Sequence, residues 1–170
     1  CLTLNGVSKS YCMTGWRLGY CGAPKEIIAA MNKIQSQSTT STSSITMAAS
    51  VEAISGPQDF IFDHNKKFIK RRDLVVSKLN EIDGITCSKP DGAFYVYPNC
   101  QDILGKITPN GKKISSDEDF MTYLLEDQGV AGVHGSAFGL SPYFRLSYAT
   151  SDHILEDACN RIQVACSKLK

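Results

Sequence analysis

The chain has 170 residues, of which 42% are hydrophobic, 9% aromatic and 21% charged. These fractions are typical of a folded domain with a substantial core, and they exclude a disordered chain, a collagen-like chain and a disulfide-held miniprotein. Lysine and arginine number 18 against 17 aspartate and glutamate, which gives a formal net charge of +1. Because no overall field favours nucleic acid or an anionic membrane, partners must be sought in local sites.

The cysteines and the N-terminal residues indicate in which cellular compartment the protein lies. Seven cysteines are scattered without a CxxC pair, which fits a reducing compartment, and hence the cytoplasm, better than a disulfide framework. No apolar stretch approaches the roughly 20 residues that span a bilayer, and no secretory signal opens the chain. The chain begins at Cys1 in a strand-like pattern without an initiator methionine, so we expect a fragment of a longer protein. We predict a cytoplasmic protein with no membrane segment, no nucleic-acid partner and no metal site.

The first half of the chain predicts two strands followed by three helices. Short buried strands are expected at residues 2–8 and 15–22, joined by a loop of small residues. Pro24 begins a helix at the first-turn position that proline tolerates. The polar residues 36–44 connect it to a second helix, which Gly56-Pro57 ends.

A longer helical pattern runs from Phe60 to Ile82. Its basic stretch, residues 66–72, could suggest a nucleic-acid footprint. Apolar residues at helical spacing and neighbouring acids indicate a solvated helix face instead.

From Ile85 onward the pattern changes to that of strands and shorter helices. Ser116 is an expected N-cap for a helix from Asp117 to Asp127, because acids crowd its first turn. A final helix is expected from Ser151-Asp152 to Lys168. Strands are expected at residues 85–87, 93–97, 130–133 and 143–149. This order predicts an α/β or α+β architecture with two subdomains joined through the long helix.

Lys9 and Arg17 stand out in the first strand pair. Lys9 lies in a stretch of small and apolar residues, from Asn5 to Tyr20, that contains no acid. Such a lysine is either exposed on a loop or held away from water, where a lowered pKa makes the amine nucleophilic toward carbonyl groups. The pattern places Arg17 inside the second strand, where a guanidinium is costly unless an anion or an ion-pair partner meets it. The residues alone leave these alternatives open.

Arg145 is predicted to project from an otherwise apolar strand. Alternation places Phe144, Leu146 and Tyr148 on one face and Arg145 on the other. A guanidinium suits a carboxylate because it binds both oxygens, although a salt bridge within the protein is the alternative. His134, in the preceding loop, is expected to be a hydrogen-bonded structural group rather than a catalyst.

Several motifs resemble one known family. Ser8-Lys9 followed by Met13-Thr14-Gly15-Trp16-Arg17-Leu18-Gly19-Tyr20 resembles the lysine signature of class I/II aminotransferases, the fold type I enzymes that use pyridoxal 5′-phosphate. Arg145-Leu146-Ser147-Tyr148-Ala149 is similar to another segment of that family, and Pro90-Asp91-Gly92-Ala93-Phe94-Tyr95 is similar to its turn and strand near the substrate. Residues 129–139 resemble a further strand and loop, with His134 in place of the customary proline. The sequence of the motif around Lys9 and Arg17 is most similar to that of bacterial aspartate aminotransferases of the Ib branch.

The resemblance implies a fold and a domain division. Residues 1–56 would be the end of the large α/β cofactor domain, residues 57–83 a long connecting helix, and residues 84–170 the C-terminal α+β small domain. In the family the lysine forms a Schiff base with pyridoxal phosphate, one arginine grips its phosphate and another holds the substrate α-carboxylate. These roles fall on Lys9, Arg17 and Arg145.

The resemblance also implies an activity. The complete protein would be a homodimer that moves the amino group of aspartate to 2-oxoglutarate by ping-pong exchange, with most other cofactor contacts upstream of Cys1. One alternative is an aromatic or broad-specificity aminotransferase of the same fold. An alternative of another class is that the chain by itself is a non-catalytic fragment.

Overall fold

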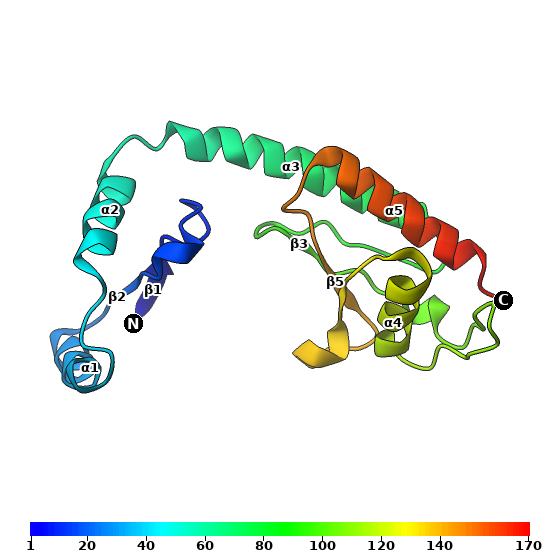
Figure 1. Ribbon diagram of the computed structural model, residues 1–170, viewed down its shortest axis with the longest axis horizontal. Coiled ribbons are helices and arrows are strands. Elements are labelled where there is room, and N and C mark those ends of the chain that lie inside the picture. Colours follow the sequence, from blue (N-terminus) through cyan, green and yellow to red (C-terminus); the bar gives the residue numbers. More distant parts are fainter. The chain divides into compact units, whose positions relative to one another are not determined.

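The chain divides into two compact units. The computed structural model describes residues 1–170, with unit 1 comprising Cys1–His64 and unit 2 comprising Asn65–Lys170. The boundary falls inside the long helix α3, Asp59–Asn80, which can be followed in Figure 1. The long helix predicted between Phe60 and Ile82 is therefore confirmed.

Unit 1 consists of a hairpin and two helices before the start of α3. Strands β1 (Thr3–Gly6) and β2 (Gly19–Gly22) pair antiparallel, and the short 3-10 helix η1 (Thr14–Trp16) lies in their connection. Helices α1 (Lys25–Ser38) and α2 (Ser44–Ser55) follow. Pro24 is the N-cap of α1, and its carbonyl accepts hydrogen bonds from the amides of Ile27 and Ile28.

The hairpin differs from its predicted form in two respects. Most of its strand residues are exposed rather than buried. The second strand begins at Gly19 rather than near residue 15, so Arg17 lies outside it. Arg17 instead follows η1 with φ 54° and ψ 50°, the left-handed conformation. The physical reason is the tight 3-10 turn at Thr14–Trp16, after which the chain must change direction before it can enter the strand.

Unit 2 is a three-stranded antiparallel sheet with helices packed against it. The sheet order is β3-β5-β4, so β5 is central. The strands are β3 (Tyr95–Val96), β4 (Val133–His134) and β5 (Phe144–Ser147). The helices are α4 (Asp117–Gln128), α5 (Asp152–Ser167) and the short 3-10 helices η2 (Gln101–Ile103) and η3 (Gly135–Phe138). The strands are shorter than predicted, and the one expected at residues 85–87 is reduced to an isolated bridge between Thr86 and Asn99.

The ends of α4 follow local rules that were readable in the sequence. The hydroxyl of Ser116 accepts a hydrogen bond from the amide of Asp119 (3.1 Å), which confirms the predicted N-cap. At the other end Gly129 adopts a left-handed conformation, with φ 67°, and its amide donates to the carbonyls of Leu124 and Leu125. Glycine takes this conformation without the steric cost of a Cβ.

The core of unit 2 lies among the sheet and the helices α3, α4 and α5. Phe120 and Phe144 are fully buried and meet edge to face, with ring centroids 5.6 Å apart. The alternation predicted along β5 holds for Phe144 and Tyr148, which are buried, and for Ser147, which is exposed, whereas Leu146 is only half-buried, as is Arg145. Helix α5 runs along the second half of α3 (Figure 1), and Asp152 at its start forms ion pairs with Lys70 (2.9 Å) and Arg71 (3.0 Å). Unit 2 thus has a continuous core of its own.

No helix combines the length and the apolar character that crossing a membrane requires.

Six of the seven cysteines are either buried in unit 2 or exposed in unit 1, and the seventh, Cys21, is half-buried in unit 1. All seven are free thiols. In unit 2, Cys87, Cys100, Cys159 and Cys166 are buried, and burial raises the pKa of Cys87 and Cys159 to about 11 and that of Cys100 and Cys166 to about 12. Cys1 and Cys12 of unit 1 are exposed.

We therefore expect iodoacetamide at pH 8 to modify Cys1 and Cys12 in the native chain and to reach the four unit 2 cysteines only after denaturation. The reagent attacks the thiolate, and a thiol with a pKa near 11 is ionised at pH 8 to roughly one part in a thousand. Peptide mass spectrometry before and after addition of urea measures the modification. Native-state alkylation of Cys100 or Cys166 at the rate of Cys12 would contradict the packing described for unit 2.

Candidate functional site

The connection between β1 and β2, residues 7–18, carries both sequence-predicted residues of unit 1. Val7 is fully buried and fixes the start of this connection. Lys9 is exposed in the turn that follows, and its carbonyl accepts a hydrogen bond from the amide of Cys12 (3.2 Å). The turn therefore offers the lysine amine on a surface that a ligand can reach.

Arg17 lies at the other end of the same connection. Its side chain is exposed, and Nη1 donates to the carbonyl of Thr14 (3.0 Å). A guanidinium has five N–H donors, so this contact leaves most of them available to an anion. Because the arginine is not in a strand, the predicted cost of burying it does not arise within unit 1.

The connection between β1 and β2 is held to the segment after α2 by a hydrogen bond that the sequence did not indicate. The hydroxyl of Tyr11 donates to Oε1 of Gln58 (3.0 Å). Nε2 of Gln58 donates in turn to the carbonyls of Ala53 (3.0 Å) and Gly56 (2.7 Å). A glutamine after Gly56-Pro57 belongs to no motif, so only its position in space identifies it as the residue that fixes this connection.

Arg145 is half-buried on β5 and is held by aromatic rings. Its guanidinium carbon lies 4.4 Å from the ring centroid of Tyr95 and 4.5 Å from that of Phe138. Among the ion pairs of unit 2, which use the arginines at 71, 72 and 161, none includes Arg145. The salt-bridge alternative is thus not realised within unit 2, and the guanidinium retains its capacity for a carboxylate.

The loop after β4 is held by a buried carboxylate. Asp117 is fully buried; its Oδ2 accepts from the amide of Ser136 (2.9 Å) and its Oδ1 from the hydroxyl of Ser136 (3.1 Å). The same hydroxyl lies 2.7 Å from Nδ1 of His134. Since the hydroxyl gives its hydrogen to Asp117, we assign the hydrogen of this last bond to Nδ1. His134 is hydrogen-bonded as predicted, whereas the role of Asp117 was not foreseen beyond its place in the first turn of α4.

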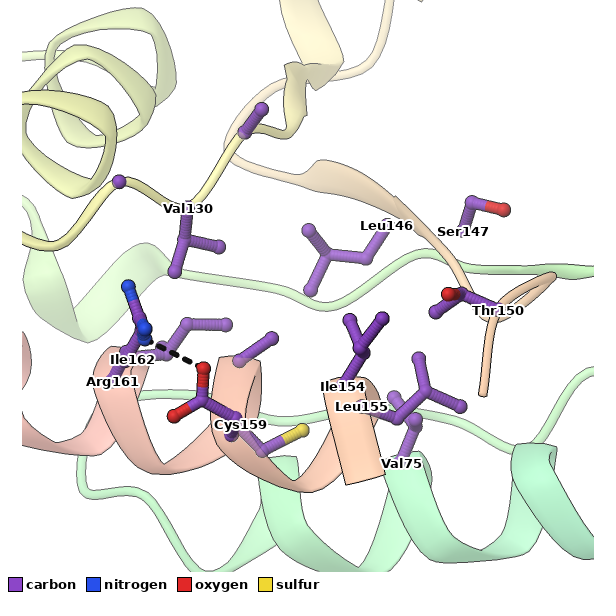
Figure 2. Close-up of a pocket in the computed structure, with 14 residues that line it drawn as sticks. Val75, Val130, Leu146, Ser147, Thr150, Ile154, Leu155, Cys159, Arg161 and Ile162 are labelled. Carbon is purple, nitrogen blue, oxygen red and sulfur yellow. Dashed lines mark ion pairs between the residues drawn. The ribbon is translucent and has the colours of Figure 1, made fainter. Parts of the chain in front are cut away.

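Unit 2 also contains a cavity of about 370 Å³ between α5, β5 and residues 129–131. Figure 2 shows that aliphatic side chains dominate its lining, among them Val130, Leu146 and Ile154. Its one arginine, Arg161, is already committed to Asp157 through an ion pair of 2.8 Å. None of Lys9, Arg17 and Arg145 lines this cavity, so it lacks the groups that would bind a phosphate or a carboxylate. No cluster of three His, Cys, Asp or Glu side chains that could hold a metal ion is present.

The sequence profile of the family "Aminotransferase class I and II" matches residues 1–162. The chain belongs to this family.

Its relatives are similar over almost the whole chain. It is 58% identical over 168 residues to the aspartate aminotransferase of Rhizobium meliloti (strain 1021), which covers 99% of this chain and 41% of that protein. It is 57% identical over 168 residues to the aspartate/prephenate aminotransferase of Cereibacter sphaeroides, which covers 99% of this chain and 42% of that protein. The chain therefore spans about two fifths of the length of these relatives.

A solved structure agrees with these matches. The crystal structure of the aspartate aminotransferase from Rhizobium meliloti superposes with a TM-score of 0.97 at 58% identity, covering 99% of this chain and 42% of that one. The expected family and the α/β class, as part of a fold type I aminotransferase, are thus confirmed.

Proposed function

We propose that the chain is the C-terminal part of a pyridoxal-phosphate-dependent aminotransferase that moves the amino group of aspartate to 2-oxoglutarate, forming oxaloacetate and glutamate. The observation that carries the proposal is the 58% identity, over nearly the whole chain, to a protein named aspartate aminotransferase. The exposed lysine and the arginine without an acidic partner in unit 2 supply the groups that such a reaction requires.

The connection between β1 and β2 fits pyridoxal phosphate by the chemistry of its donors. An exposed amine at Lys9 can join an aldehyde, and the uncommitted N–H groups of Arg17 match a phosphate. When bound, the cofactor supplies that aldehyde and a ring that takes up electrons from the substrate Cα.

Lys9, Arg17 and Arg145 would each have a distinct role in the reaction. Nζ of Lys9 would hold the cofactor through its aldehyde and would carry the proton removed from the substrate Cα. Arg17 would hold the phosphate of the cofactor. Arg145 binds the α-carboxylate of the substrate through two parallel hydrogen bonds.

Exposed apolar side chains of unit 1 support a larger assembly. Ile34, Ile45 and Val51 are 73%, 72% and 64% exposed, and the only buried residues of α2 are Thr46 and Ser50. An exposed apolar surface of this extent is typical of a face that another part of the protein covers. We propose that the upstream part of the enzyme and a second subunit cover it in a homodimer.

The proposed domain division follows the family. Residues 1–56 would complete the cofactor domain, residues 57–83 form the connecting helix, and residues 84–170 form the small domain. The cytoplasmic location inferred from the cysteine pattern stays a prediction.

A second candidate is an aminotransferase with aromatic or broad specificity. One relative is named for prephenate as well as aspartate, and the side-chain pocket would be formed largely by residues outside this chain. Comparing kcat/KM for aspartate, tyrosine and glutamate with a fixed acceptor would separate the two. A preference for tyrosine over aspartate would favour the second candidate.

We expect borohydride reduction of the complete enzyme with pyridoxal phosphate to place the pyridoxyl group on Lys9, because this lysine combines exposure with the family motif. Peptide mass mapping identifies the site. Lys9→Ala should abolish both labelling and turnover with the fold retained, whereas Lys25→Ala, which removes an exposed lysine at the start of α1, should change neither. A pyridoxyl group on any other lysine would contradict the assignment.

We expect Arg145→Leu to lower kcat/KM for aspartate by about 2–5 kcal/mol of transition-state binding, because the substrate carboxylate would be left without its partner. The kcat/KM of Arg145→Lys should lie between that of the unchanged enzyme and that of Arg145→Leu, since an ammonium keeps the charge but cannot form two parallel hydrogen bonds. Arg161→Leu, which removes an arginine from the α5 surface, serves as the control. Steady-state kinetics measure the effect, and an unchanged kcat/KM in Arg145→Leu would remove this residue from the site.

We expect the isolated 170-residue chain to have little or no aspartate aminotransferase activity. Lys9 and Arg17 provide a covalent bond and one phosphate contact, while the remaining contacts of the cofactor would come from residues outside the chain. The measurement is oxaloacetate formation by the chain and by the complete enzyme at equal concentration with saturating pyridoxal phosphate. Comparable rates would show that this chain is self-sufficient.

A further inference from the structure

The aromatic contacts of Arg145 carry an inference that rests on its proposed role toward the substrate carboxylate. We propose that Tyr95 and Phe138 form an aromatic clamp that positions the Arg145 guanidinium, so that these two residues help to set the affinity for a carboxylate ligand. They would act through Arg145, as positioning residues.

Two aromatic rings hold the guanidinium of Arg145. Its carbon lies within 4.5 Å of both ring centroids, and the ring faces attract a cation electrostatically. A ring face does not accept two parallel N–H bonds as a carboxylate does. The clamp therefore fixes the arginine side chain without using its hydrogen-bonding edge, whereas an acidic partner would compete with the ligand.

The register of the sheet determines where Tyr95 lies. Tyr95 pairs with Ser147 across β3 and β5, and Ser147 is two positions from Arg145. Residues two apart on a strand share a face, and diagonal neighbours on adjacent strands are within reach of long side chains. The tyrosine ring and the guanidinium are consequently brought together by backbone pairing.

Phe138 is the last residue of η3. The two hydrogen bonds from Ser136 to the buried Asp117 fix this short helix. A side chain at Gly135 would collide with the carbonyl oxygens of Leu140 and Tyr143. The ring of Phe138 also meets that of Tyr97 edge to face, with centroids 6.3 Å apart. These contacts fix the position of η3 and therefore the position of the Phe138 ring.

A residue that only positions Arg145 has a distinctive energetic signature. Removing a ring should weaken carboxylate binding and raise KM, because the arginine samples more conformations. The proton transfer by Lys9 should be affected much less, so kcat should change less than KM. The effect should also disappear when Arg145 itself is absent.

The test uses the complete enzyme with pyridoxal phosphate and maleate, a dicarboxylate without an amino group, as the probe. Isothermal titration measures the dissociation constant for maleate, and steady-state kinetics with aspartate give kcat and KM. Tyr95→Leu and Phe138→Leu should each weaken maleate binding about five- to tenfold, as expected for a cation–π contact. Tyr95→Phe and Phe138→Tyr, which keep the rings, should bind within about twofold of the unchanged enzyme.

Two further comparisons separate positioning from loss of packing. Phe68→Leu removes a ring elsewhere in unit 2, one that contacts Phe94 and Tyr148, and should leave maleate binding unchanged even if it lowers the melting temperature. In an Arg145→Leu background, Phe138→Leu should cause no further loss of affinity.

The outcomes distinguish the two proposals. If Arg145→Leu does not weaken maleate binding, the proposed role of Arg145 fails. If it does, but Tyr95→Leu and Phe138→Leu bind maleate normally, only the clamp is refuted. An equal loss from Phe138→Leu with and without Arg145 would also refute the clamp, because the ring would then act independently of the arginine.

Discussion

The register of β5 between β3 and β4 is the constraint on which unit 2 depends. Because side chains alternate along a strand, one register places Phe144 in the core and Arg145 on the opposite face. A slip of one residue would bury the guanidinium and expose the phenylalanine. The core contact between Phe120 and Phe144 therefore stabilises the same arrangement that presents Arg145, so the packing of unit 2 and its proposed binding function have one physical cause.

A buried carboxylate performs a comparable task in the loop after β4. Burying Asp117 would be costly without partners, and the structure supplies three donors, the amide and hydroxyl of Ser136 and the amide of Glu118. These bonds connect the start of α4 to η3, and η3 carries Phe138. An acid that looks like an ordinary first-turn residue of a helix is thereby coupled to the environment of an arginine on a different strand.

The two units contribute different parts of the proposed chemistry and differ in how complete they are. Unit 2 has a continuous core with four buried thiols and a carboxylate-binding candidate. Unit 1 presents Lys9 and Arg17 on a connection fixed by Val7 and by the hydrogen bond between Tyr11 and Gln58, yet leaves much apolar surface exposed. The covalent anchor would thus lie in the unit that most needs further chain to cover it.

The sequence by itself determined the features that depend on near neighbours: the helices, the Ser116 cap, the alternation along β5 and the motifs around Lys9 and Arg145. These follow from spacing and side-chain chemistry, which are local. Only the tertiary structure decided that Arg17 takes a left-handed conformation after a 3-10 turn rather than lying in a strand, and that Arg145 meets Tyr95 and Phe138. The geometry around Arg17 depends on how a 3-10 turn closes, and the residues around Arg145 are 50 and 7 positions away in the chain, so backbone pairing and loop packing, not local pattern, bring them together.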